Sequence, residues 1–62
     1  MNTVKEHRLD RGMTLQAVAD IAGTSKGHIH DIENNRKEPR VTTALKIAKA
    51  LRVNVTKLWG IE

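Results

Sequence analysis

The stretch TLQAVADIAGTSKGHIHDIENN, residues 14–35, decides the fold of this chain. Two short helical patterns flank a four-residue link at 22–25, in which Gly23 favours the left-handed conformation that closes a helix. Ser25 is typical of an N-cap, because its hydroxyl accepts a backbone N–H from the first turn of the next helix. A link this short sets the two helices at a steep angle. The pattern therefore predicts a helix-turn-helix unit.

The composition narrows the class of protein. With 62 residues the chain has room for a single small domain, expected to span 1–62, with a correspondingly small core. It has no cysteine, which excludes disulfides and thiolate metal sites and fits a reducing cytoplasm. No apolar run is long enough for a membrane span, and the N-terminus does not look like a signal peptide. Eleven Lys and Arg against seven Asp and Glu give a net charge of +4, which favours nucleic acid as the partner.

Apolar periodicity predicts five helices and no strand. Their expected ranges are about 3–11, 15–22, 26–34, 43–51 and 55–59. The first is the least regular, because His7 stands where an apolar residue is expected one turn after Val4. Thr14 and Asn54 are the expected N-caps of the second and fifth helices, and Pro39 keeps the preceding loop extended. The fold class is therefore predicted to be all-α, a compact five-helix bundle.

The fourth helix has the most regular apolar face. Its members are Ala44, Leu45, Ile47, Ala48 and Leu51. We expect Leu58 of the last helix to face the core against Leu45 and Leu51. In the third helix, Ile29 and Ile32 mark the side that faces inward, and the opposite side is too polar to be core.

The order and spacing of these residues resemble those of the Cro and lambda-repressor family of helix-turn-helix proteins. The resemblance covers nearly the whole chain and rests on an ordered set: Arg8, Gly12, Thr14, Val18-Ala19, Gly23-Thr24-Ser25, Ile29, Ile32-Glu33, Pro39 and 44–51. It implies a five-helix bundle whose third helix reads an operator, and twofold dimers on inverted repeats. The chain departs from the family at two positions. Family members often have a glutamine that grips a phosphate directly after the cap of the second helix, where this chain has Leu15 and its glutamine follows one position later, at Gln16. Many members have a glycine after the third helix, where this chain has Asn35.

The N-terminal part of the third helix carries the residues expected to contact bases, because that end of a recognition helix points into the major groove. They are Lys26, Gly27, His28, His30 and Asp31. Lys26 can donate to guanine, and Asp31 can accept from a cytosine amino group. The alternative for Asp31 is an ion pair with a nearby Lys or Arg. His28 and His30 diverge by about 200° around the helix, so they cannot chelate one metal ion together.

Phosphate contacts are expected at the N-termini of the second and third helices and in the loop after the third. The residues are Thr14, Gln16, Ser25, Asn34, Asn35, Arg36, Lys37 and Arg40. The alternative for Arg36 and Lys37 is a solvated run of charge. Their position beside the third helix argues for contact with DNA.

Two further sets of residues are expected to hold subunits and helices together. Glu33 lies on the inner side of the third helix, where a carboxylate needs a partner. The family resemblance makes Arg8 that bidentate partner, and the alternative is two exposed charges. Large apolar residues near the C-terminus are expected to form a dimer interface, the alternative being a lone exposed tryptophan on a monomer. The expected interface consists of Val55, Leu58, Trp59 and Ile61.

These observations favour a sequence-specific regulator of transcription that binds double-stranded DNA, a Cro-like repressor of a phage or prokaryote. It is expected at the nucleoid in the cytoplasm, bound to an inverted-repeat operator as a homodimer that is weak when free and stronger on DNA. Enzyme motifs are missing, and no cofactor, metal, small-molecule ligand or membrane is expected. One alternative is a protein-interaction module such as an antitoxin, which an exposed apolar surface beyond the dimer patch would favour. The other is a restriction-modification controller.

Overall fold

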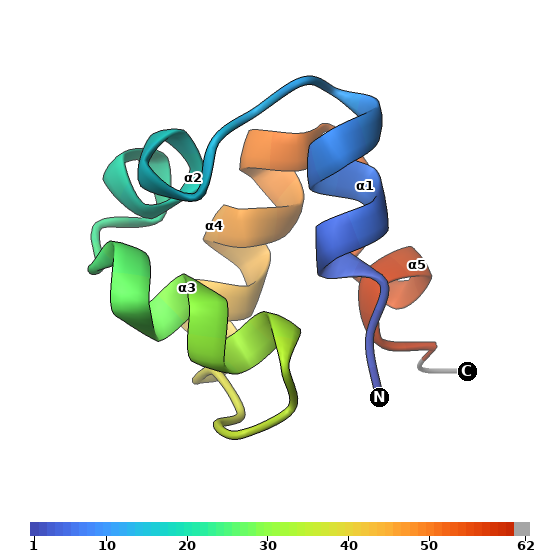
Figure 1. Ribbon diagram of the computed structural model, residues 1–62. Coiled ribbons are helices and arrows are strands. Elements are labelled where there is room, and N and C mark those ends of the chain that lie inside the picture. Colours follow the sequence, from blue (N-terminus) through green and yellow to red (C-terminus); the bar gives the residue numbers. More distant parts are fainter. Residues whose placement is uncertain (61–62) are drawn as a thin grey trace.

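The computed structural model describes residues 1–60, which form five helices joined by short loops (Figure 1). The helices are α1 (Val4–Asp10), α2 (Leu15–Ala22), α3 (Lys26–Glu33), α4 (Val41–Leu51) and α5 (Val55–Trp59). α4 lies at the centre, with α2 and α3 on one side and α1 and α5 on the other. This part of the chain has no strand, so the predicted all-α fold is confirmed. Among residues 1–60, no helix combines the length and the hydrophobicity that a membrane span requires.

The helix N-termini follow the local chemistry that the sequence indicated. The hydroxyls of Thr14 and Ser25 accept hydrogen bonds from backbone N–H groups three residues ahead, at 3.0 and 3.1 Å. The side-chain oxygen of Asn54 caps α5 by accepting from the backbone N–H of Thr56, two residues ahead. α4 begins at Val41, two residues before the expected start, because the carbonyl of Arg40 already accepts the first helical bond. The side chain of Arg40 makes no cap bond, so the sequence carried no capping signal there.

Four helices end in the same hydrogen-bonded motif, closed by a residue in the left-handed conformation. Gly12 and Gly23 serve α1 and α2, where a glycine avoids the steric penalty on a Cβ atom. α3 and α4 instead use Asn35 at φ 59° and Arg52 at φ 56°. Asn35, where the resemblance implied a glycine, adopts the left-handed conformation, which asparagine reaches more readily than most residues.

Ten apolar side chains form one core. They are Val4, Val18, Ala19, Ala22, Ile29, Ile32, Ile47, Ala48, Leu51 and Leu58. The expected inward position of Leu58 is confirmed, but Leu45 is 51% exposed and does not belong to the core. The buried residues of α4 are Ile47, Ala48 and Leu51, and at 100° per residue Leu45 lies about 115° from their mean direction. Leu45 is therefore at the edge of the apolar arc, on the solvent side.

The first residues of the chain join the C-terminal ends of two helices. Thr3 donates its backbone N–H to the carbonyl of Leu58 and its hydroxyl to the carbonyl of Lys57, both at 2.8 Å. The side-chain amide of Asn2 donates to the carbonyl of Ile32 at 2.8 Å. The chain start therefore helps to fix α5 and the end of α3 relative to α1.

Candidate nucleic-acid interface

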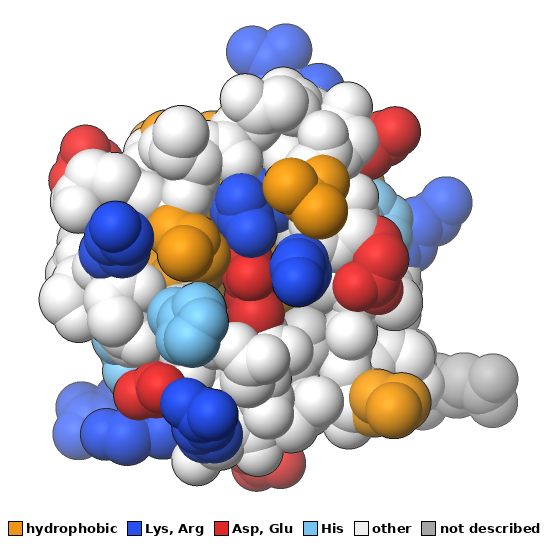
Figure 2. Space-filling model, in the orientation of Figure 1, with side chains coloured by type: hydrophobic (Ala, Val, Ile, Leu, Met, Phe, Trp, Pro, Cys, Tyr) orange, Lys and Arg blue, Asp and Glu red, His pale blue; other side chains and the backbone are white. Residues whose placement is uncertain are grey.

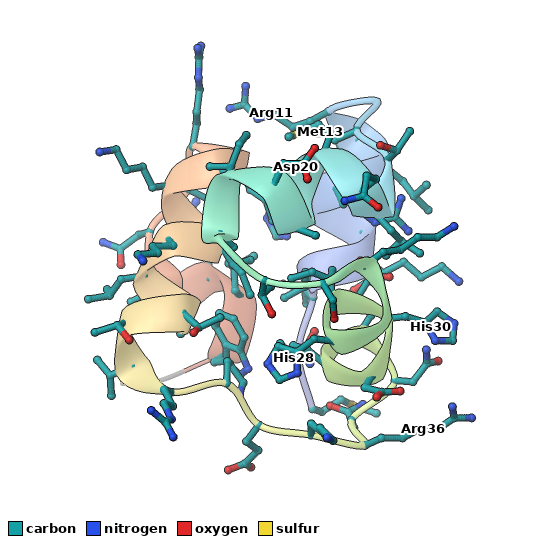
Figure 3. All side chains as sticks on the ribbon, turned by 90° about the vertical axis from the view of Figure 1, so that its left-hand side faces the viewer. Arg11, Met13, Asp20, His28, His30 and Arg36 are labelled. Atoms are coloured by element: carbon teal, nitrogen blue, oxygen red, sulfur yellow. The ribbon has the colours of Figure 1, made fainter. Side chains whose placement is uncertain are left out.

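α2 and α3 form the helix-turn-helix unit, and their inner sides are fully buried. In α3, Ile29 and Ile32 have no exposed surface and set the orientation of the helix. The five residues predicted to contact bases lie away from this buried stripe. Lys26, Gly27 and His30 are exposed, while His28 and Asp31 are half-buried at the edges of the outer face. Figure 3 shows His28 and His30 pointing to different sides of α3.

The N-termini of α2 and α3 each leave backbone donors free. In each helix one first-turn N–H bonds to the capping hydroxyl. Within residues 1–60 the N–H groups of Leu15, Gln16, Lys26 and Gly27 have no hydrogen-bond acceptor. These donors, with the positive end of the helix dipole, can bind a phosphate oxygen without moving any side chain.

Three of the predicted phosphate contacts involve side-chain amides that have partners within the protein. Gln16 donates to the carboxylate of Asp20 at 2.8 Å, one turn along α2. Asn34 donates to the carbonyl of His30 at 2.8 Å. Asn35 accepts a hydrogen bond from Asn2 at 3.2 Å. The bonds of Gln16 and Asn34 each use one hydrogen of an NH2 group, and the bond of Asn35 uses only its amide oxygen, so each side chain retains a donor for a phosphate. The internal bonds restrict the direction of these donors, and the charged residues of the loop bind a phosphate more strongly.

The loop after α3 carries three exposed cations. Arg36, Lys37 and Arg40 are all exposed. Arg36 lies 3.9 Å from Asp31, which is the ion pair that the sequence left open as the alternative role of that carboxylate. At this distance and exposure such a pair contributes little to stability. Figure 2 shows Lys, Arg and His side chains over α3 and the loop that follows it, with acidic side chains between them.

On the opposite side of α3, Glu33 meets Arg8 of α1. The Nε of Arg8 donates to one carboxylate oxygen of Glu33 at 2.7 Å, and an Nη group donates to the other at 3.2 Å. The second Nη group donates to the carbonyl of Met13 at 2.9 Å. One guanidinium therefore ties α3 to α1 and to the loop before α2. No buried side-chain N or O atom in the described part of the chain lacks a hydrogen-bond partner.

The predicted dimer residues have different surroundings. Val55 and Trp59 are half-buried and pack on the core, with part of each side chain at the surface. Leu58 is only 1% exposed, so it has no surface to offer a partner and must be removed from the set. Ile61 lies outside the described residues.

Sequence reasoning missed two apolar residues beside this patch. Val41 is 75% exposed, and Leu45 is also at the surface. Both line a groove of about 420 Å³ together with Val55 and Trp59. No local signal distinguished them from core residues, because they continue the apolar arc of α4. Elsewhere among residues 1–60, no group of three or more His, Asp or Glu side chains is placed to hold a metal ion.

Comparison with known proteins gives two results. A family model described as helix-turn-helix matches residues 4–58. The HTH-type transcriptional regulator SutR of Escherichia coli strain K12 is 41% identical to this chain over 51 residues. The matched segment is 82% of this chain but 29% of SutR, so the chain spans less than a third of the length of that relative.

Proposed function

The chain belongs to the helix-turn-helix family, and from that premise we propose that it is a sequence-specific DNA-binding regulator of transcription. The observation that carries the proposal is the two-sided construction of α3. Its inner side is fixed by Ile29, Ile32 and the bond of Glu33 to Arg8. Its outer side carries polar residues that do not pack in the core. A helix built in this manner can enter a major groove without disturbing the fold.

Base recognition would come from the outer side and the first turn of α3. The ammonium group of Lys26 can donate to O6 and N7 of a guanine, and the carboxylate of Asp31 can accept from the amino group of a cytosine. Gly27 has no neighbouring atom within 4 Å of where a Cβ would lie, so the backbone there is open to a base edge. His30 projects from the same face, and His28 would make a flanking contact.

Phosphate contacts would fix the register of α3 in the groove. The free N–H groups at the starts of α2 and α3 would hold one strand, beside the capping residues Thr14 and Ser25. Arg36, Lys37 and Arg40 would bind phosphates on the other side of α3. Gln16, Asn34 and Asn35 would add weaker contacts through the amide N–H groups that their internal bonds do not use.

We further propose that two copies bind an inverted repeat through the groove between α4 and α5. Val41, Leu45, Val55 and Trp59 provide an apolar surface that a second copy can cover. The surface is small, so the free dimer would be weak, and two half-sites about one helical turn apart would strengthen it. Such a regulator would act as a Cro-like repressor in the cytoplasm of a prokaryotic or phage-infected cell.

Selection of binding sites from a pool of random duplex DNA tests the proposal. We expect enrichment of an inverted repeat with half-sites about one turn apart. Leu45→Glu should remove the preference for paired half-sites and leave binding to a single half-site unchanged. Ile21→Glu is the matched control, because Ile21 is similarly exposed, at 53%, but lies outside the groove. A pool that shows no enrichment would contradict sequence-specific binding.

A further inference from the structure

A second hollow, of about 530 Å³, shares no residue with the candidate DNA surface or with the groove between α4 and α5, and only Met13 adjoins the start of α2. Its lining comes from the end of α1, the loop before α2, the end of α2 and the end of α4: Arg11, Met13, Ile21, Lys49, Ala50 and Arg52. In Figure 3, Arg11 and Met13 lie at the opposite end of the molecule from His28 and Arg36. The part of the hollow formed by Ile21 and the end of α4 would therefore stay accessible in a protein bound to DNA through α3.

The floor of the hollow is apolar. Ile21 is more than half exposed there, although most isoleucines in folded proteins are buried. Met13 and Ala50 are half-buried beside it. The three side chains come from three separate segments, so the fold brings them together at the surface without covering them.

The rim of the hollow is basic. Arg11, Lys49 and Arg52 are exposed, and none of them forms an ion pair within residues 1–60. Arg52 also holds the left-handed conformation that closes α4, a place where glycine costs the backbone less. The chain uses glycine for the same purpose at the ends of α1 and α2. Arg52 therefore places a cation at the rim of the hollow at a position where the backbone alone would favour glycine.

We propose that this hollow docks an acidic amphipathic segment of a partner protein. Carboxylates of the segment would pair with Arg11, Lys49 and Arg52, while an apolar side chain would cover Ile21 and Met13. The charge of the rim and the apolar floor together define this occupant. The site is separate from the proposed DNA function and does not depend on it.

Other occupants fit less well. A nucleic-acid backbone would satisfy the cations but would offer no apolar group to cover Ile21. In a twofold contact, a second copy would place its own Arg11, Lys49 and Arg52 against the same three cations, and these like charges would repel. A small ligand needs a cavity that encloses most of its surface. Four of the six lining residues are exposed, so this hollow is too open to enclose one.

An NMR titration of the whole chain tests the proposal. The probe is a peptide of about twelve residues with Glu and Leu at helical spacing, capped at both ends. We expect the backbone amide signals of Met13, Ile21 and Ala50 to shift most. A peptide with Gln in place of each Glu should bind more weakly, and so should a peptide with Ser in place of each Leu, because each lacks one of the two matching groups.

Two charge reversals on the same exposed side of α4 provide the matched variants. Lys49→Glu should weaken binding of the probe by about tenfold, because it replaces an attraction by a repulsion. Lys46→Glu changes the net charge equally but lies outside the hollow, so it should weaken binding by no more than about twofold. Arg52→Gly should also weaken binding, and it is expected to stay folded because glycine suits the backbone at that position.

Three outcomes would overturn the proposal. Equal effects of Lys46→Glu and Lys49→Glu would show that only net charge attracts the peptide. Equal binding of the Ser-substituted peptide would show that the apolar floor has no part in it. If the amide signals of α3 and the loop after it shifted most, the peptide would be bound at the candidate DNA interface of the protein. Binding of duplex DNA by Lys49→Glu is measured alongside, so that failure here is distinguishable from failure of the proposed regulator.

Discussion

Two ion pairs lie on opposite faces of α3 and differ in almost every respect. Arg8 and Glu33 meet at 2.7 Å on the inner face, with side chains 10% and 2% exposed. Arg36 and Asp31 meet at 3.9 Å on the outer face, with side chains 69% and 34% exposed. Water screens the outer pair, so its partners can separate at little cost. The inner pair has no such freedom, since removal of one partner leaves the other charge buried. One helix thus has a fixed side and an exchangeable side.

The largest expected loss of stability comes from removing one partner of the inner ion pair. Glu33→Ala should lower the free energy of unfolding by about 2–4 kcal/mol, because it leaves a buried guanidinium without its carboxylate. Arg8→Ala should cost a similar amount, and the double variant much less than the sum. Denaturant titration measures all three. Strictly additive losses would mean that the two side chains do not depend on each other.

On the outer face the same chemistry should affect recognition of DNA rather than folding. Lys26→Ala should reduce discrimination at one base-pair position by about 1–3 kcal/mol, while binding to other sequences changes little. Competition between the selected operator and single-base variants measures this difference. Uniform weakening across all sequences would instead make Lys26 a phosphate contact.

The left-handed residues that close α4 and α3 can be compared in the same way. Arg52→Gly should raise the free energy of unfolding by about 1 kcal/mol, because it relieves a left-handed residue that carries a Cβ. Asn35→Gly is the matched control and should gain less, since asparagine adopts this conformation at lower cost. Thermal unfolding of the two variants compares them. A loss of stability in Arg52→Gly would show that its side chain contributes contacts that outweigh the backbone strain.

Features that depend on residues close together in the sequence could be predicted, and features that depend on distant residues could not be predicted without the family resemblance. Thr14, Ser25 and Asn54 were predicted as caps, because a cap needs only a side chain and the next turn of the helix. The pairing of Arg8 with Glu33 required the family resemblance, because the two residues are 25 positions apart. The five helices and the inward face of α3 followed from periodicity alone.

Tertiary packing accounts for what the sequence did not predict. Leu45 belongs to an apolar arc in the sequence, and only the direction from which α2 and α5 approach α4 leaves it in solvent. The bonds of Asn2 to the end of α3 join residues 30 or more positions apart, and no local pattern announces them. The basic hollow likewise combines residues from 11 to 52 that no single helix brings together.

The smallest effect on stability is expected from the outer ion pair. Arg36→Ala should change the free energy of unfolding by less than about 0.5 kcal/mol, because an exposed pair contributes little. The same variant should weaken binding to all DNA sequences alike. It should also reduce the slope of log K against log salt by about 1, as expected for the loss of one phosphate contact. A large loss of stability would mean that Arg36 stabilises the fold, as Arg8 does.

The central claim is that the outer side of α3 enters the major groove. Methylation interference on the selected operator tests it most directly, because methylation blocks guanine N7 in the major groove and adenine N3 in the minor groove. We predict that methylated guanines in both half-sites prevent binding, and that Lys26→Ala relieves this interference at one guanine in each half-site. Interference confined to adenine N3, or a guanine pattern that outer-face variants leave unchanged, would contradict the account.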